Sequence, residues 1–298
     1  MNKILNVLRR IPPREKSIIM ILTTVFFFTM MDVVAKILVQ TYPSMQVIWA
    51  RYTSQSVVSI LILAPILRKV LITNNLKLQL VRSTFLFLAT FFFFTSLKYI
   101  PLAEVNAIFQ VSPIIVTSLS AIILKEFVDI RRWAGVIFGM VGALIIIRPG
   151  SDLFSIYFTF PLLSAFCYAS YIISTRHLNH EEHAATNFIY SSLVGTIIAS
   201  ILVIQDWTPI KNTDLFLFCI VGLLGGMGHI GLIYAFKISQ ASFLAPFNYT
   251  TLLFAGLWGF FLFDEIPTYF TFIGATIIVS SAIFIWIKDQ NKNKSLQN

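Results

Sequence analysis

The sequence predicts an all-α membrane protein of ten transmembrane helices, arranged as two inverted repeats of five helices. Composition gives the first observation: 57% of the residues are hydrophobic, 12% are charged, and the mean hydropathy is +0.82. A soluble domain carries charge on roughly a quarter of its residues, so this chain has too little polar surface for water and its solvent must be lipid. Two further observations support this prediction: the chain contains ten apolar runs, and Lys and Arg are unevenly distributed between them.

Ten segments have the length of a membrane span, which is about 20 residues with a range of roughly 17–25. Their predicted bounds are Ser17–Val39, Ser44–Ile66, Val81–Tyr99, Leu102–Leu124, Arg132–Arg148, Phe154–Thr175, Ala185–Gln205, Asp214–Lys237, Ser242–Phe263 and Thr268–Ile287. The apolar runs are continuous and do not alternate with polar residues, which favours helices over barrel strands. Residues 1–16 and 288–298 then form tails, and residues 17–148 and 152–287 form two five-helix units.

The first apolar run is interpreted as a span that stays in the mature protein. A cleaved signal peptide has an apolar region of about 7–15 residues and a small-residue cleavage site. The run from Ser17 is longer and has no such site. The later spans are separated by short connections in which Pro, Gly, Asn and Asp are common, so no separate soluble domain is predicted.

The distribution of basic residues predicts the orientation of the spans. Of the 22 Lys and Arg, two lie within spans (Lys36 and Arg51), three fall on one side (Lys98, Arg148 and Lys211), and the other 17 fall on the opposite side, which includes both tails. The positive-inside rule therefore predicts that both termini are cytoplasmic. The net charge of +9 is explained by basic loops facing anionic lipid, so nucleic acid is not an expected partner.

Three residue pairs indicate an internal repeat. Lys98 and Lys237, Glu126 and Glu265, and Gly135 and Gly274 are each separated by 139 residues. Five spans per unit is an odd number, so the second unit must enter the membrane from the opposite side. Inverted repeats are typical of secondary transporters, whose substrate site lies near the midplane between the halves.

Several other classes of protein are disfavoured. Cys167 and Cys219 lie in apolar runs and are interpreted as small buried residues. The His177–His183 segment lacks a strong metal-ligand motif and is interpreted as a solvated loop, so neither a metal nor another cofactor is expected. No phosphate-binding GxxxxGK[ST] loop is present, which excludes an ATPase. A membrane-embedded transferase is the main rival class, yet no interfacial cluster of catalytic residues supports it, and no charged ring supports a channel.

The two units each resemble the EamA repeat of the drug/metabolite transporter superfamily. The first copy carries Ala103-Glu104-Val105-Asn106, Pro113, Leu124-Lys125-Glu126, Trp133-Ala134-Gly135 and Gly139–Pro149. The second carries Ala241–Pro246, Asn248-Tyr249-Thr250, Phe263-Asp264-Glu265-Ile266-Pro267 and Ile273-Gly274-Ala275, with Leu252 where the first copy has Pro113. The resemblance implies a carrier of the bacterial inner membrane and not an enzyme.

Two motifs in the first two spans narrow this resemblance. Residues 32–36 (Asp-Val-Val-Ala-Lys) and 49–52 (Trp-Ala-Arg-Tyr) are similar to the branch that contains bacterial riboflavin and S-adenosylmethionine carriers. The partners implied are a small-molecule substrate and membrane lipid, and a homodimer stays open. Riboflavin is the leading expectation, because flat polar rings suit an interior rich in aromatic and amide side chains. S-adenosylmethionine, amino acids and drug-like compounds are the alternatives.

Three charged residues inside spans are candidate binding residues: Asp32, Lys36 and Arg51. A charge at mid-span costs about 2.5–3.5 kcal/mol on insertion scales, so it is usually paired and functional. Asp32 and Arg51 are each seven residues from the predicted end of neighbouring spans, so we expect them at matched depth and able to form an ion pair. The competing interpretation is a structural bridge, with Lys36 reaching toward the membrane surface.

The remaining candidates are polar and aromatic residues of later spans. Asn106, Phe109 and Gln110 precede Pro113, which frees a backbone carbonyl and is tolerated where a helix lines a cavity. Asn248 and Tyr249 repeat the theme in the ninth span, and Tyr168, Tyr171, His229 and Trp258 complete the predicted substrate site. For each of these the alternative is packing: polar contacts between helices, interface anchors, or a histidine buried among glycines.

Overall fold

The computed structural model describes residues 12–123, 130–148, 155–178, 182, 184–238 and 245–295, and these residues contain helices but no strands. The first repeat contains α2 (Pro13–Thr41), α3 (Ser44–Leu63), η1 (Ala64–Ile66), α4 (Leu67–Val70), α5 (Leu76–Leu97), α6 (Leu102–Phe109), α7 (Ser112–Ile123) and α8 (Ile130–Ile147). The second contains η2 (Ile156–Phe158), α9 (Thr159–Leu178), α10 (Ala184–Leu202), η3 (Val203–Asp206), α11 (Leu215–Ile238), η4 (Ala245–Tyr249), α13 (Thr250–Phe263) and α14 (Tyr269–Ser295).

One pair of helix starts has the interval of a repeat. α5 begins at Leu76 and α11 at Leu215, which is 139 residues later, whereas α2 and α9 begin 146 residues apart, at Pro13 and Thr159. The interval between the starts of α5 and α11 equals the spacing of the three residue pairs in the sequence. Glu126, the first-repeat member of one pair, lies outside the described residues.

The interior holds charged and polar side chains among apolar ones, and large apolar side chains are exposed on the surface, unlike in a water-soluble protein. Asp32, Arg51 and Arg82 are at most 5% exposed, whereas the aliphatic and aromatic side chains of Leu253 and Phe261 are 68% and 69% exposed. Charged groups are almost never buried in soluble domains unless they are paired. This distribution is stable only when the surrounding solvent is hydrocarbon.

Six of the described helical segments are long and apolar enough to cross a membrane. They are Glu15–Thr41, Ser44–Val70, Leu76–Leu97, Ile156–Thr175, Ala185–Asp206 and Leu215–Leu232. Four shorter apolar segments accompany them: Leu102–Val116, Ile137–Ile147, Phe247–Phe263 and Tyr269–Ser281. The protein is therefore a multi-pass membrane protein.

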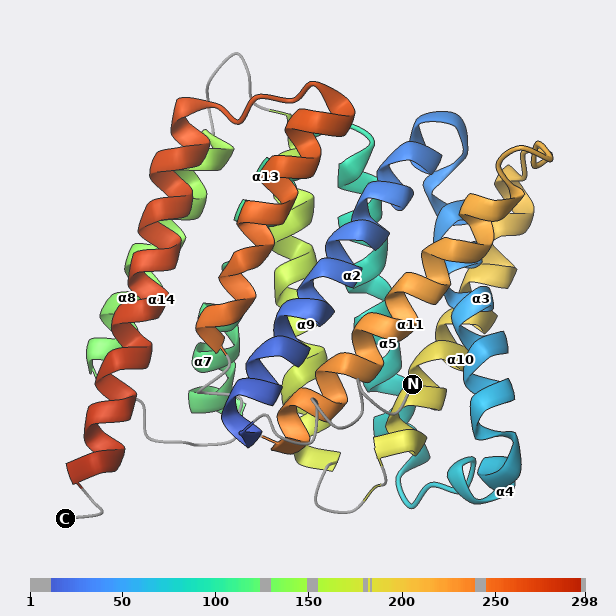
Figure 1. The fold of residues 1–298 in the computed structure, drawn as a ribbon, viewed down its shortest axis with the longest axis horizontal. Coiled ribbons are helices and arrows are strands. Elements are labelled where there is room, and N and C mark those ends of the chain that lie inside the picture. The colour runs from blue at the N-terminus through green and yellow to red at the C-terminus, as the bar shows by residue number, and fades with distance from the viewer. Residues whose placement is uncertain are drawn as a thin grey trace.

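The helices stand side by side in one broad bundle (Figure 1). α8 and α14 lie together at one edge, while α3 and α10 lie at the other, and α2, α5, α9 and α11 fill the centre. Helices from different repeats pair throughout, because α2 packs on α11, α5 on α9, and α8 on α14. The surfaces that meet inside the bundle thus come from both repeats.

The bundle has two ends, the Thr41 end and the Leu76 end. The Thr41 end, at the top of Figure 1, holds the α2–α3 turn and the α13–α14 connection; the Leu76 end lies opposite. At the Thr41 end, the Tyr42 hydroxyl donates to the Asp214 carboxylate at 2.7 Å, and the Gln46 amide donates to the Thr208 carbonyl at 2.8 Å. These bonds join the α2–α3 turn to the segment between α10 and α11.

The Leu76 end is held together by a buried arginine. Arg82 is fully buried on α5, and its guanidinium donates to Gln79 on the same helix and to acceptors on α9 and α10. Those acceptors are the Thr175 hydroxyl, the Asn187 carbonyl and the Ser191 hydroxyl. α5 begins at Leu76 and not at the predicted Val81, because Asn75 caps it by accepting from the Leu78 amide at 3.1 Å.

The fourth predicted span is broken into two helices. α6 ends at Phe109, and α7 begins at Ser112 with Pro113 in its first turn. A proline has no amide hydrogen, so the carbonyl of Phe109 loses its helical partner and the helix cannot continue. The turn at Gln110 and Val111 lies within the bundle, where both residues are buried.

Candidate functional site

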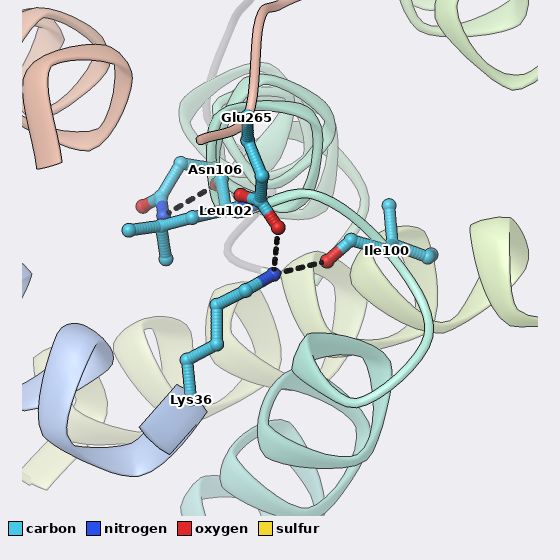
Figure 2. A network of polar contacts seen from close by, with 5 residues as sticks. All are labelled: Lys36, Ile100, Leu102, Asn106 and Glu265. Atoms are coloured by element: carbon cyan, nitrogen blue, oxygen red, sulfur yellow. Dashed lines mark hydrogen bonds and ion pairs between the residues drawn. The ribbon is translucent and has the colours of Figure 1, made fainter. Parts of the chain in front are cut away.

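Lys36 forms an ion pair with a residue that is distant in sequence. Its ammonium group lies 2.6 Å from the Glu265 carboxylate and donates to the Ile100 carbonyl at 2.9 Å (Figure 2). Lys36 is 4% exposed, and its ammonium group also lies 5.3 Å from the centre of the Phe263 ring. The Lys36 side chain thus ends on a carboxylate in the connection between α13 and α14.

Glu265 reaches α2 because of the way α13 ends. Asp264 takes a left-handed backbone conformation with φ 54°, and the Glu265 amide donates back to the Gly259 carbonyl at 3.0 Å. Aspartate is one of the few residues that accept this conformation readily. The turn directs the Glu265 side chain toward α6, where its carboxylate also accepts from the Leu102 amide at 2.8 Å. A carboxylate at a helix N-terminus is favoured by the unpaired amides there.

A cavity of about 410 Å³ lies beside this ion pair at the Thr41 end. It is lined by Lys36, Gln40, Lys98, Tyr99, Ile100, Pro101, Phe263 and Glu265. The Tyr99 ring stacks on Tyr157 with ring centres 3.6 Å apart. The cavity opens to the surface, and the Lys36–Glu265 pair lies at its wall.

Arg51 lies deep in the bundle among aromatic and sulfur groups. Its Nε donates to the Met31 sulfur at 3.4 Å, and the guanidinium carbon lies 4.5 Å from the Tyr52 ring centre and 6.0 Å from that of Phe94. Arg51 is 3% exposed, and its Nη1 atom is buried with no hydrogen-bond partner. A buried donor left unsatisfied costs roughly 1–3 kcal/mol.

Asp32 contacts Asn106 and not a basic side chain. Its carboxylate lies beside the Asn106 amide and within the electrostatic field of Arg51. Among the described residues, however, no ion pair joins Asp32 to Arg51. The expected bridge between the first two spans is therefore wrong: the Arg51 guanidinium turns to Met31, Tyr52 and Phe94, and the helix that meets Asp32 is α6.

The broken helix α6 links the first repeat to the second. Gln110 donates from its amide to the Asn248 carbonyl in η4 at 3.0 Å. Phe109 lies 5.4 Å from Tyr168 of α9, measured between ring centres, and Asn106 donates to the Leu102 carbonyl one turn earlier. Predicted site residues from both repeats, Asp32, Asn106, Phe109, Gln110, Tyr168 and Asn248, thus follow one another across the bundle.

The other predicted residues lie around this group. Tyr249 is 8% exposed and packs in a separate hydrophobic cluster with Ile108 and Val111. Tyr171 lies 5.9 Å from Tyr168 and faces the Arg82 guanidinium. The centres of the His229 and Phe28 rings lie 5.1 Å apart in an edge-to-face arrangement. Those of Trp258 and Phe26 lie 6.2 Å apart, and the ring N–H of Trp258 is buried without a hydrogen-bond partner.

Sequence reasoning missed two residues, Gln55 and Glu265. Gln55 is one turn after Arg51 on α3, is 3% exposed, and has an amide oxygen without a hydrogen-bond partner. Its spacing from Arg51 was the available signal, because a polar residue four positions from an intramembrane charge shares its helical face. Glu265 was interpreted as structural, and no local pattern connects it to Lys36.

Among the possible metal ligands of the His177–His183 segment, Glu182 is the one whose side chain the structure describes. His180, Glu181 and His183 lie outside the described residues. Glu182 accepts from the Thr73 hydroxyl at 2.6 Å and from the Asn74 amide at 2.7 Å. This carboxylate therefore ties the α4–α5 connection to the second repeat.

Buried polar and aromatic groups that converge from two apolar repeats define a membrane carrier for small molecules. Known protein families agree with this class. The EamA-like transporter family matches residues 15–148 and again residues 155–287. The chain belongs to this family, which confirms the resemblance of the sequence and its two-copy organisation.

Named relatives are transporters of different compounds. The riboflavin transporter of Vibrio cholerae is 27% identical over 251 residues, which cover 82% of this chain and 84% of that protein. The S-adenosylmethionine uptake transporter of Rickettsia prowazekii is 24% identical, covering 89% and 90%. A pseudopaline exporter of Pseudomonas aeruginosa is 25% identical, covering 90% and 95%. A crystal structure of a further protein shares the fold with a TM-score of 0.66, 16% identity, and coverage of 93% and 99%.

Proposed function

We propose that this protein is a secondary transporter that moves the small polar metabolite riboflavin across the bacterial inner membrane. The observation that carries the proposal is the convergence of Asp32, Arg51 and Asn106 with Phe109 and Tyr168 inside an apolar bundle. Intramembrane polar groups that come from two repeats are typical of substrate sites in secondary transporters. The relatives come from bacteria, which supports the bacterial membrane.

The proposed topology has ten spans with both termini in the cytoplasm. The six long apolar segments and the four shorter ones together supply ten crossings. α2 runs toward the Thr41 end, whereas its counterpart α9 starts there, next to the Tyr99–Tyr157 stack. This opposite direction supports an inverted repeat and makes the Thr41 end periplasmic under the positive-inside rule.

Riboflavin suits the chemistry of this interior. Its flat ring can lie against Phe109 and Tyr168, and its ribityl hydroxyl groups can bond to amides such as Asn106 and Gln110. Aromatic faces with a few convergent polar groups are the usual lining of sites for such ligands. The named riboflavin transporter of Vibrio cholerae is the relative that supports this choice.

One observation favours S-adenosylmethionine as a second candidate. Lys36 is held by Glu265, and among the described residues Asp32 has no ion pair. A buried carboxylate without a basic partner can receive a cationic group, and S-adenosylmethionine carries a sulfonium. Against it stands Arg51, whose positive charge acts on Asp32 and would repel a cation.

We further propose that the Lys36–Glu265 pair closes the periplasmic side of the substrate path. The pair connects α2 to the segment between α13 and α14, and Glu265 also binds the start of α6. Alternating access requires such contacts to break and reform as the repeats rock about a central site. The cavity beside the pair is then the periplasmic entrance in its closed form.

A growth experiment tests the substrate. A riboflavin auxotroph that lacks its own importer is grown at limiting external riboflavin, with or without this protein. We expect growth from the wild-type chain and none from Arg51→Ala expressed to the same level. No growth advantage, together with accumulation of labelled S-adenosylmethionine in the same membranes, would establish the second candidate and reject riboflavin.

Transport assays in proteoliposomes measure the direction of transport and the substrate specificity separately. Labelled riboflavin is supplied outside or preloaded inside, and unlabelled riboflavin, S-adenosylmethionine or amino acids compete. The presence of an exporter among the relatives makes this comparison necessary. We expect riboflavin alone to compete, and flux inhibited equally well by amino acids would contradict the proposed specificity.

A further inference from the structure

Arg51 and Gln55 each carry one buried hydrogen-bonding atom that has no partner in the described structure. They lie on successive turns of α3, and each side chain is 3% exposed. The Arg51 Nη1 donor and the Gln55 Oε1 acceptor both lack a partner. Buried polar groups are almost always hydrogen-bonded, so an adjacent unpaired donor and acceptor indicate a missing ligand.

α11 comes close to both side chains because it carries glycines there. A Cβ built on Gly225 would lie 2.9 Å from the Met31 sulfur, 3.7 Å from Gln55 Oε1 and 3.8 Å from Arg51 Nε, so the Gln55 amide oxygen and the Arg51 guanidinium both border this glycine. A Cβ built on Gly226 would have one neighbour within 4 Å, the Gln55 side chain, although Gly226 itself is buried. Buried space therefore remains beside the Gln55 amide.

Aromatic rings limit what can occupy the space. Tyr52 and Phe94 flank the guanidinium of Arg51, and Met31 fixes its Nε. A ligand that satisfies both orphan groups must carry an acceptor next to a donor, as in a ring with C=O beside N–H.

We propose that Arg51 and Gln55 together recognise the polar edge of the transported ring. Arg51 Nη1 donates to a ring carbonyl, and Gln55 Oε1 accepts from the neighbouring ring N–H. This inference rests on the proposed function, because the isoalloxazine ring of riboflavin presents this sequence of groups at C2, N3 and C4. Gln55 is then a specificity-determining residue of the transporter.

The test compares riboflavin with 3-methylriboflavin, which lacks the N3 proton. Binding to the purified full-length protein is measured by quenching of flavin fluorescence. Leaving a buried acceptor unpaired lowers affinity substantially, so we expect the wild type to prefer riboflavin by at least about tenfold. Gln55→Leu should bind riboflavin about tenfold more weakly and bind the two flavins equally, while Gln55→Glu, which keeps an acceptor, should retain the preference.

The leucine variant also separates hydrogen bonding from crowding. Leucine has nearly the volume of glutamine, so a preference caused by the bulk of the methyl group would survive in Gln55→Leu and overturn the proposal. Ser56→Ala is the matched control, since Ser56 is buried on the same helix but bonds to Thr196 of α10 at 2.8 Å. It should keep the full preference.

The outcomes distinguish this inference from the proposed function. If the wild-type protein binds and transports both flavins equally, the edge recognition is wrong while riboflavin transport stands; this comparison needs no variant to fold. If the wild-type protein binds no riboflavin, both proposals are wrong.

Discussion

Two buried arginines have different roles because their hydrogen bonds differ. Arg82 is surrounded by acceptors on α5, α9 and α10, so its guanidinium holds helices of both repeats together. Each guanidinium has one buried atom without a partner, Nε in Arg82 and Nη1 in Arg51, but the contacts of Arg51 are with a sulfur atom and aromatic rings. A group that the protein leaves unsatisfied serves stability poorly, so Arg51 is retained for what it binds.

Substitution of the two arginines should separate these roles. Arg51→Ala is expected to lower uptake by at least about tenfold while expression falls little, because a single unsatisfied donor contributes little to folding. Arg82→Ala leaves several buried acceptors unpaired and should reduce the folded protein. Uptake per folded molecule, with the folded amount taken from size-exclusion chromatography, is the measurement.

A structural role for Arg51 would give a different pattern. Arg51→Ala would then reduce folded protein, and adding Asp32→Ala would restore it, because the second change removes a carboxylate left without its cation. That result would assign Asp32 and Arg51 to the scaffold and remove both from the substrate site.

Single residues show where sequence reasoning succeeds and fails. The three charges inside spans were identifiable from their cost in lipid, and all three are buried. Their partners were not identifiable. Lys36 pairs with Glu265, 229 positions later, because a left-handed Asp264 turns the chain at the end of α13. Pairing at such a distance depends on the tertiary fold and leaves no local pattern.

At the scale of elements, the connection between α13 and α14 is the most informative. The Glu265 carboxylate makes two contacts: it pairs with Lys36, and it caps α6 by accepting from the Leu102 amide. Glu104, also at the start of α6, accepts from the Thr271 hydroxyl of α14 at 2.9 Å. α2, α6 and α14 therefore meet at one polar junction.

Glu265→Gln should open this junction without removing the cap. Glutamine keeps an oxygen for the Leu102 amide and loses the charge that holds Lys36. We expect a cysteine placed at Asn106, in a chain without Cys167 and Cys219, to react at least about fivefold faster with a membrane-impermeant reagent, since a buried ion pair loses several kcal/mol when one partner is neutralised.

Two further variants test the assignment. Lys36→Met should raise the labelling rate equally, and the double variant should add nothing, as expected for two members of one interaction. Glu104→Gln is the control, because Glu104 bonds to Thr268 and Thr271 at the same junction. Equal acceleration by Glu104→Gln would mean that general loosening, and not the ion pair, controls access.

Element bounds were predictable where a chemical signal marks them. Pro43 and Pro101 precede α3 and α6, and both helices start where the sequence predicts. The sequence predicted that Pro113 frees a backbone carbonyl, but it did not predict that the helix divides into α6 and α7. Pro113 is nevertheless the cause of this break. The last helix continues to Ser295, past the predicted Ile287, because the polar residues that follow are compatible with a helix outside lipid.

For the whole molecule, the central prediction is topology. Single cysteines at Thr41 and Lys211 should react with an impermeant reagent from the periplasmic side, and cysteines at Lys125 and Lys294 should react only after the cells are permeabilised. The physical reason is the concentration of Lys and Arg on one side of the spans. Labelling of Lys125→Cys or Lys294→Cys in intact cells would reject the orientation.

The overall architecture was more predictable than the site. Lipid restricts a spanning chain to helices or closed barrels, so continuous apolar runs determine the class of fold. The 139-residue interval was visible in three residue pairs and recurs in the starts of α5 and α11. Which faces of those helices meet was not visible, because amphipathic patterns are weak when both lipid and core are apolar.

The crossing of α8 and α14 restricts which substitutions can be accepted at two glycines. A Cβ on Gly142 would lie 2.8 Å from the Gly274 carbonyl, and a Cβ on Gly274 would lie 2.5 Å from the Gly142 carbonyl. Each glycine makes room for the backbone of the other copy, so a larger residue at one position is incompatible with the present geometry at both. Although the two copies are free to diverge elsewhere, here they are obliged to evolve jointly, and sequences descended from the same duplication should show correlated substitution at these two sites.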